Sequence, residues 1–116
     1  MKRLAVLLVA SMLPAAAADA PQDSWKTFEV KLDARGMHEE CMTVDANDKR
    51  RWQWKADGPV DFNVHFHKGN SVSYPVKRDG MRGDGGVFQP KTREDYCWMW
   101  TARDKPVTLE GRIETR

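Results

Sequence analysis

The stretch Val60–His67, with the sequence VDFNVHFH, alternates between apolar and polar residues along its whole length. Successive side chains of a β-strand point to opposite faces, so this period of two predicts a strand with one buried face and one solvated face. The triplets Asp57-Gly58-Pro59 and Lys68-Gly69-Asn70 flank the stretch. Their turn-forming residues predict the two ends of the strand.

The chain on either side of this stretch also predicts strands. Segments with period-two alternation or β-branched and aromatic residues lie at 27–32, 51–55, 71–77, 87–89, 96–101 and 107–114. Pro75 indicates an edge strand or a bulge, whereas the glycines and aspartates of residues 78–86 indicate a turn or an exposed loop. We therefore expect an all-β domain, an antiparallel β-sandwich or jelly roll of about eight short strands.

The first eighteen residues have the layout of a secretory signal peptide. Its three parts are basic Lys2 and Arg3, the apolar run Leu4–Leu13, and the small residues Ala16–Ala18 before Asp19. The apolar run of about ten residues is too short to span a bilayer. We expect cleavage after residue 18, an N-terminal extension over 19–26, and a domain over 27–116. The protein should be periplasmic or secreted, with no stable membrane insertion after cleavage.

Cys41 and Cys97 are the two cysteines of the chain. In the oxidising conditions that an exported protein meets, two cysteines form one disulfide by default. A Cys41–Cys97 bond closes a long loop, which contributes roughly 4 kcal/mol in the chain-entropy model.

The charge of the mature chain does not favour nucleic acid as a partner. Removal of Lys2 and Arg3 lowers the basic residues from 19 to 17, which equals the 17 acidic residues, all of them at or after Asp19. A net charge of zero gives no electrostatic support for binding nucleic acid or an anionic membrane surface.

Short motifs around the two cysteines resemble the GOLD (Golgi dynamics) domain of cargo receptors in the early secretory pathway. The motifs are Glu40-Cys41, Gly58-Pro59, the strand 60–64, and the sequence YCWMW at 96–100. The resemblance covers roughly residues 28–113, and it implies a disulfide-linked jelly roll that acts as a binding module. The chain carries no coiled coil or membrane span after residue 114, so the coat-binding and membrane functions of those receptors are not transferred to it.

His65 and His67 form the motif with the most definite chemistry. Residues i and i+2 of a strand share a face, so the two imidazoles can converge on one ion, and imidazole suits copper or zinc. Met99 and His38 are candidates for additional ligands. A stable site needs three or four ligands, so the alternative is a plain solvated face of the strand.

Four tryptophans form two pairs with i, i+2 spacing, Trp52 with Trp54 and Trp98 with Trp100. Two interpretations are open: the indoles fill the core beside the disulfide, or they form an aromatic platform for a small ligand.

The sequence offers no catalytic constellation. Glu39-Glu40 and Glu94-Asp95 are adjacent residues, and adjacent residues of a strand face opposite sides, so they do not form a carboxylate pair. We therefore expect a non-enzymatic exported module that binds a protein or a small ligand, with copper or zinc binding through His65 and His67 as the alternative.

Overall fold

The computed structural model describes residues 24–116, which form six antiparallel β-strands joined by short connections. The strands are β1 (Trp25–Leu32), β2 (Met37–Val44), β3 (Arg50–Lys68), β4 (Ser71–Phe88), β5 (Glu94–Ala102) and β6 (Val107–Glu114). The order across the sheet is β1-β6-β3-β5-β2, and β4 pairs along β3. Residues 24–116 contain no helix that is long and apolar enough to cross a membrane.

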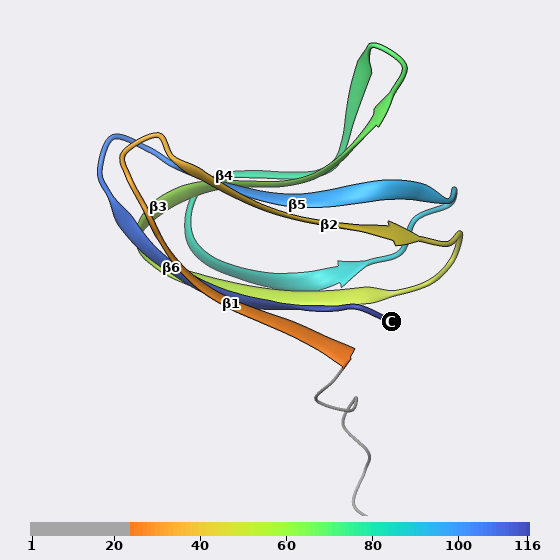
Figure 1. Cartoon of the computed structure of the whole chain (residues 1–116), viewed down its shortest axis with the longest axis horizontal. Coiled ribbons are helices and arrows are strands. Elements are labelled where there is room, and N and C mark those ends of the chain that lie inside the picture. Colours follow the sequence, from red (N-terminus) through yellow and green to blue (C-terminus); the bar gives the residue numbers. More distant parts are fainter. Residues whose placement is uncertain (1–23) are drawn as a thin grey trace, which may run out of the picture.

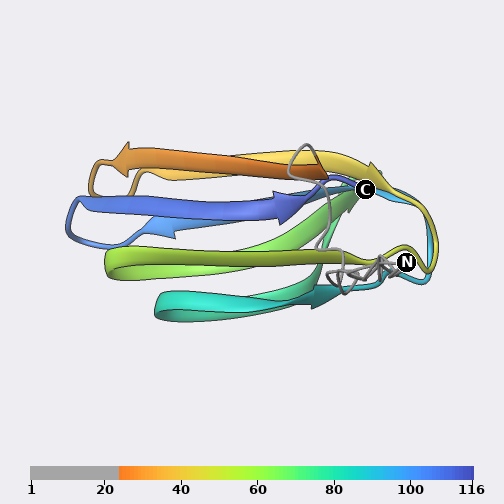
Figure 2. The ribbon, with the colours of Figure 1, turned by 90° about the horizontal axis from the view of Figure 1, so that it is seen from below.

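The sheet curls into two layers because β3 serves both of them (Figure 1). Residues 52–56 of β3 pair with β6, and residues 60–65 pair with β5. We call β1, β6, the first half of β3 and the second half of β4, which pairs with it, the terminal layer. We call β2, β5 and the second half of β3 the disulfide layer. Figure 2 shows β1, β6, β3 and β4 side by side in the terminal layer.

The core between the layers consists of side chains that alternate inward along each strand. Phe62 lies at its centre, with its ring centroid 5.7 Å from those of both Trp52 and Trp54 and 5.4 Å from that of Trp100. Apolar side chains from all six strands belong to this cluster, among them Leu32, Val44, Phe88, Tyr96 and Ile113. The alternation in 60–67 thus predicted the face of β3 that packs in the core correctly. The opposite face, expected to be solvated, is buried at Asn63 and His65, so that part of the prediction was wrong.

The prediction of eight strands was wrong because two predicted breaks lie inside strands. Asp57-Gly58-Pro59 belongs to β3, where the chain bends between the layers and the pairing with β4 shifts register between Lys55 and Val60. Pro59 lies in this interruption of the ladder, where its missing N–H leaves no pairing unmade. The turn chemistry therefore produces a bend in one long strand rather than a connection between two.

The glycine-rich segment 78–86, expected as a loop, is part of β4. Gly86 pairs with Trp52, and a Cβ added at residue 86 would lie 2.7 Å from Cη2 of the indole. Glycine is therefore needed in the strand so that the backbone of β4 can approach Trp52 closely.

The other boundaries agree more closely with expectation. β6 has the expected range 107–114, whereas β1 begins at Trp25, two residues before the expected strand. Pro75 lies in a bulge, since residues 73–76 of β4 face residues 64–66 of β3 with a register shift. The expected signal peptide lies outside the described residues.

We predict that Phe62→Ala lowers the free energy of unfolding by about 3–5 kcal/mol, because it removes the ring that three indoles surround. Denaturant unfolding followed by tryptophan fluorescence measures the change. Val87→Ala is the control: Val87 is 55% exposed, so the loss should stay within about 0.5 kcal/mol. Equal losses in the two variants would contradict this core.

Candidate functional site

The disulfide expected from the cysteine count is present between β2 and β5. Cys41 and Cys97 are direct partners in the antiparallel ladder, with their Cα atoms 4.0 Å apart. Their neighbours Trp98 and Trp100 face the core, so both sulfurs lie on the outer face of the disulfide layer. Cys41 is exposed and Cys97 is nearly buried.

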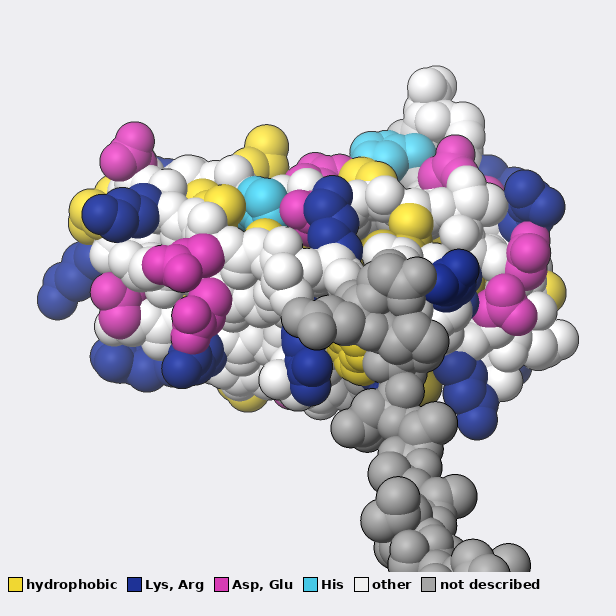
Figure 3. Space-filling model, turned by 60° about the horizontal axis from the view of Figure 1, so that its bottom comes forward, with side chains coloured by type: hydrophobic (Ala, Val, Ile, Leu, Met, Phe, Trp, Pro, Cys, Tyr) yellow, Lys and Arg dark blue, Asp and Glu magenta, His cyan; other side chains and the backbone are white. Residues whose placement is uncertain are grey.

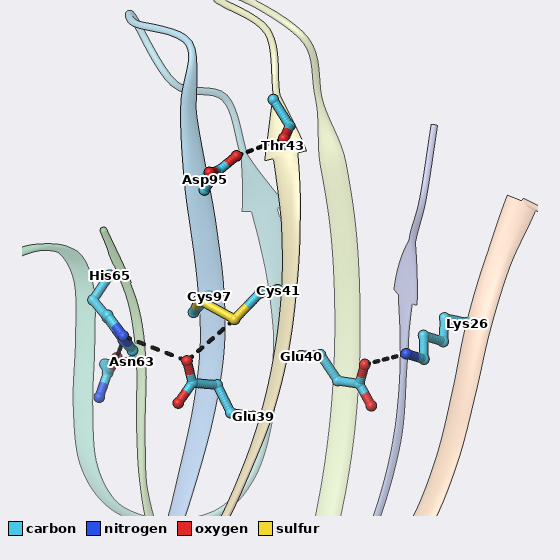
Figure 4. Close-up of a disulfide and its surroundings, with 9 residues drawn as sticks. All are labelled: Lys26, Glu39, Glu40, Cys41, Thr43, Asn63, His65, Asp95 and Cys97. Atoms are coloured by element: carbon cyan, nitrogen blue, oxygen red, sulfur yellow. Dashed lines mark hydrogen bonds and ion pairs between the residues drawn. A yellow bond between two sulfur atoms is a disulfide. The ribbon is translucent and has the colours of Figure 1, made fainter. Parts of the chain in front are cut away.

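Glu39, Asn63 and His65 surround the disulfide on this outer face (Figure 4). Nδ1 of His65 is 2.7 Å from Oδ1 of Asn63, which accepts its proton, and Nε2 is 3.8 Å from Oε1 of Glu39. Oε1 of Glu39 also lies 3.1 Å from Sγ of Cys41. A disulfide sulfur carries no proton, so this last approach is a contact and not a hydrogen bond.

His65 is buried in this position, with only 5% of its side chain exposed. Burial lowers its pKa below the ordinary value of 6.5, opposed by the negative charge of Glu39 and assisted by the nearby His67. The imidazole is therefore neutral at pH 7.

The structure brings three of the four expected metal ligands to one face. His67 is exposed, and its ring centroid is 5.3 Å from that of His65. Met99 pairs with Asn63 of β3 and lies on the same outer face. His38 does not join them: its ring lies 4.9 Å from that of Phe28 on the inner side, and its Nε2 is 2.9 Å from Glu40.

Of the two interpretations of the tryptophan pairs, burial supports the core and not the aromatic platform. Trp52, Trp54, Trp98 and Trp100 are at most 5% exposed and belong to the core cluster. Both strands that carry them turn these residues toward the opposite layer, so none of the four presents a face to a ligand.

A second exposed feature adjoins the disulfide face, namely the hairpin between β3 and β4. Its tip, residues 66–74, rises above the disulfide layer in Figure 1. Val72 and Tyr74 are exposed large apolar side chains there, at 39% and 50%. The Tyr74 ring centroid lies 5.9 Å from that of His65, and Nζ of Lys77 lies 5.8 Å from the Tyr74 ring.

The exposed side chains of Val72 and Tyr74 were not predicted from the sequence, although a strand over 71–77 was. Val72 and Tyr74 are apolar residues at i and i+2 with serine between them. This spacing would have indicated that the strand has one apolar face. Their exposure follows from the edge position of β4, which pairs only with β3 among the described strands.

The outer face of the terminal layer carries a shallow groove with mixed charge. Thr27, Gln53 and Arg112 form one side of it, and Glu29, Lys55 and Glu110 form the other. Lys55 and Glu110 form an ion pair at 2.7 Å. Figure 3 shows acidic and basic side chains interspersed on the molecule seen from this side, so the groove carries no single sign of charge.

Comparison with solved structures finds a likeness to a periplasmic inhibitor of g-type lysozyme, PliG from Aeromonas hydrophila. The TM-score is 0.55 with 14% sequence identity, over 84% of this chain and 91% of that one. A de novo designed double-stranded β-helix is less similar, with TM-score 0.44 and 18% identity over 77% and 99% of the two chains. The first likeness establishes a shared fold.

No protein-family model matches the chain, and no curated protein matches it in sequence. The resemblance to GOLD domains therefore stays a prediction from the motifs.

We predict that denatured, unreduced protein gives no adduct with a thiol reagent, because both cysteines are bonded. Reduction should lower the free energy of unfolding by about 2–5 kcal/mol, which denaturant titrations with and without a reductant measure. Labelling of unreduced chains in stoichiometric amount would contradict the bond.

We also predict that stability falls as the pH is lowered below 6.5. The pKa of His65 is lowered in the folded state. As the pH falls, His65 is therefore protonated first in the unfolded chain, and this protonation stabilises the unfolded state relative to the folded one. His65→Asn should reduce the slope of unfolding free energy against pH below pH 6.5. His67→Asn should reduce it less, because His67 is the smallest of the causes that shift the pKa of His65. An unchanged slope in His65→Asn would contradict the burial of this imidazole.

Proposed function

We propose that the protein is an exported, non-enzymatic binding module whose partner is a lysozyme. Two features support the proposal: the likeness in fold to a lysozyme inhibitor, and the projecting β3–β4 hairpin with its exposed apolar residues. The expected leader and the disulfide fit a periplasmic or secreted location.

The hairpin carries the proposal, because it combines exposure with rigidity. Tyr74 and Val72 alternate onto one face of the strand, while Phe66 and Val76 pack against the core from the same hairpin. Phe66 lies edge-on to Tyr96, with ring centroids 5.3 Å apart. A tyrosine that is half exposed and held in place loses little conformational freedom on binding, which is why tyrosine is common among the residues that dominate interfaces.

The shape of the hairpin supports a lysozyme as the partner. Lysozymes cleave a polysaccharide that must lie in an open cleft, and a two-stranded projection with Val72 and Tyr74 exposed beside its polar turn is complementary in shape to a cleft. We infer that the partner contacts the hairpin and the adjoining disulfide face. The mixed-charge groove of the terminal layer lies outside this contact.

The positions of the adjacent acidic residues Glu39 and Glu40 are also in keeping with a module that binds without catalysis. Glu39 lies on the outer face beside His65, whereas Glu40 points inward to an ion pair with Lys26 (Figure 4). The two neighbouring carboxylates are thus on opposite sides of the sheet and do not act on one substrate.

The resemblance to GOLD domains is compatible with this proposal, because it concerns only the general class of protein. It implies a disulfide-linked β-domain that binds a partner, here without the receptor's membrane segments. Copper or zinc binding through His65 and His67 is the second candidate, and the 5.3 Å between their ring centroids favours it.

The test is inhibition of cell-wall lysis by purified g-type lysozyme, with c-type and i-type enzymes in parallel. We predict stoichiometric inhibition of at least one of them. Tyr74→Ala should raise the inhibition constant about thirtyfold, which corresponds to the roughly 2 kcal/mol of a dominant interface residue. Val72→Ala should weaken inhibition less.

Val87→Ala is the matched control, because Val87 is an exposed valine of β4 on the terminal layer. Its inhibition constant should equal that of the wild type. Absence of inhibition and of calorimetric binding for all three lysozymes would refute the partner. Equal effects of the Tyr74 and Val87 variants would refute the hairpin as the binding surface.

A further inference from the structure

Four side chains with metal-binding atoms converge on the outer face of the disulfide layer. A carboxylate oxygen of Glu39, a ring nitrogen of His65 and Sγ of Cys97 all lie within 4.8 Å of one another. Sγ of Cys41 is bonded to Cys97 and lies 3.1 Å from Oε1 of Glu39. These atoms come from β2, β3 and β5, so the register of three strands places them together.

The spacing of these atoms resembles that around a tetrahedral ion. Zinc bonds of about 2.3 Å to sulfur and about 2.0–2.1 Å to nitrogen or oxygen place neighbouring ligand atoms roughly 3.3–3.8 Å apart. The observed distance from Nε2 of His65 to Oε1 of Glu39 is 3.8 Å. Two pairs of atoms are closer than this range: Sγ of Cys41 and Oε1 of Glu39, which are 3.1 Å apart, and the two sulfurs, which are bonded to each other.

His65 is oriented as a metal ligand would be. Its Nδ1 donates to Asn63, which fixes the tautomer and leaves the lone pair of Nε2 directed at Glu39. In known metal sites the second ring nitrogen of a ligating histidine makes this kind of hydrogen bond.

We propose that reduction of the Cys41–Cys97 disulfide opens a site for Zn²⁺, formed by both thiolates, His65 and Glu39. The proposal is independent of the lysozyme partner. It differs from a site on His65 and His67, because it takes its sulfur ligands from the disulfide and needs no contribution from His67. In the oxidised protein the sulfurs carry no negative charge, and the site lacks half of its ligands.

The redox step is balanced by a dithiol. The exposed sulfur of Cys41 is accessible to a thiolate of the dithiol, which forms a mixed disulfide and then resolves to the cyclic disulfide of the reductant. The two electrons go to the cysteine sulfurs, and protonation gives two thiols. Binding of Zn²⁺ then releases two thiol protons. Exchange of the two thiolates with a disulfide reagent, which takes up the two electrons and leaves as two thiols, re-forms the S–S bond and expels the ion.

Cobalt(II) is the probe, because its spectrum reports sulfur ligation. Mature protein is reduced with a phosphine under anaerobic conditions, freed of it by gel filtration, and titrated with Co²⁺. We expect thiolate-to-cobalt charge-transfer bands and tetrahedral d–d bands that saturate at one ion per chain, and their loss when Zn²⁺ is added. The oxidised protein should show none of these bands.

His65→Asn and His67→Asn are the matched pair, since both histidines are on the same face of one strand. His65→Asn should weaken Zn²⁺ affinity of the reduced protein at least about tenfold, because even outer partners of ligands contribute about that much. His67→Asn should leave the affinity within twofold of wild type. If reduction unfolds the chain, addition of Zn²⁺ should restore the near-ultraviolet circular dichroism of the folded state.

Three results would overturn the site. Reduced wild-type protein without charge-transfer bands shows that the thiolates do not bind the ion. Equal losses in the two histidine variants show binding by an unstructured chain, and equal Zn²⁺ affinity of oxidised and reduced protein assigns the ion to the His65–His67 pair instead.

Discussion

The pairing of β3 with three other strands is the constraint on which the rest of the structure depends. Its first half pairs with β6, its second half with β5, and β4 follows it along both halves. Because one continuous strand belongs to both layers, the bend at Asp57-Gly58-Pro59 sets how the layers face each other. The core of Phe62 and the surrounding indoles lies in the space that this bend encloses.

The same strand connects the core to the surface that we propose to be functional. Phe62 and Val64 point inward, while Asn63 and His65 point outward beside the disulfide. Past these residues, β3 continues into the projecting hairpin that carries Tyr74. The disulfide fixes β2 to β5 next to this point, so the hairpin rises from the part of the sheet that is covalently cross-linked. A rigid base of this kind lowers the entropy cost of binding through the tip.

The sequence predicted what depends on local periodicity and on composition, and little of what depends on long-range packing. Alternation in 60–67 predicted the buried face of β3, and the count of two cysteines predicted the disulfide. The Gly-Pro bend of β3 and the glycines of β4 predict ends of strands, but both lie inside strands. The close approach of Trp52 to Gly86 explains why glycine lies in β4, and this approach is a long-range contact. The tryptophan pairs permitted both a core and a platform, and only the second layer makes them core. The proximity of Glu39 to His65 depends on the register of three strands, which no local pattern encodes.

The central claim is that one end of this curled sheet presents a binding hairpin. Hydrogen–deuterium exchange with and without lysozyme tests this claim most directly. The account predicts slower exchange in the complex for amides of the hairpin tip, residues 66–74, and of the adjoining part of β2. Amides of β1 and β6, on the other layer, should exchange at the same rate in both samples. Slower exchange confined to β1 and β6 would contradict the account, because it would place the partner on the mixed-charge groove.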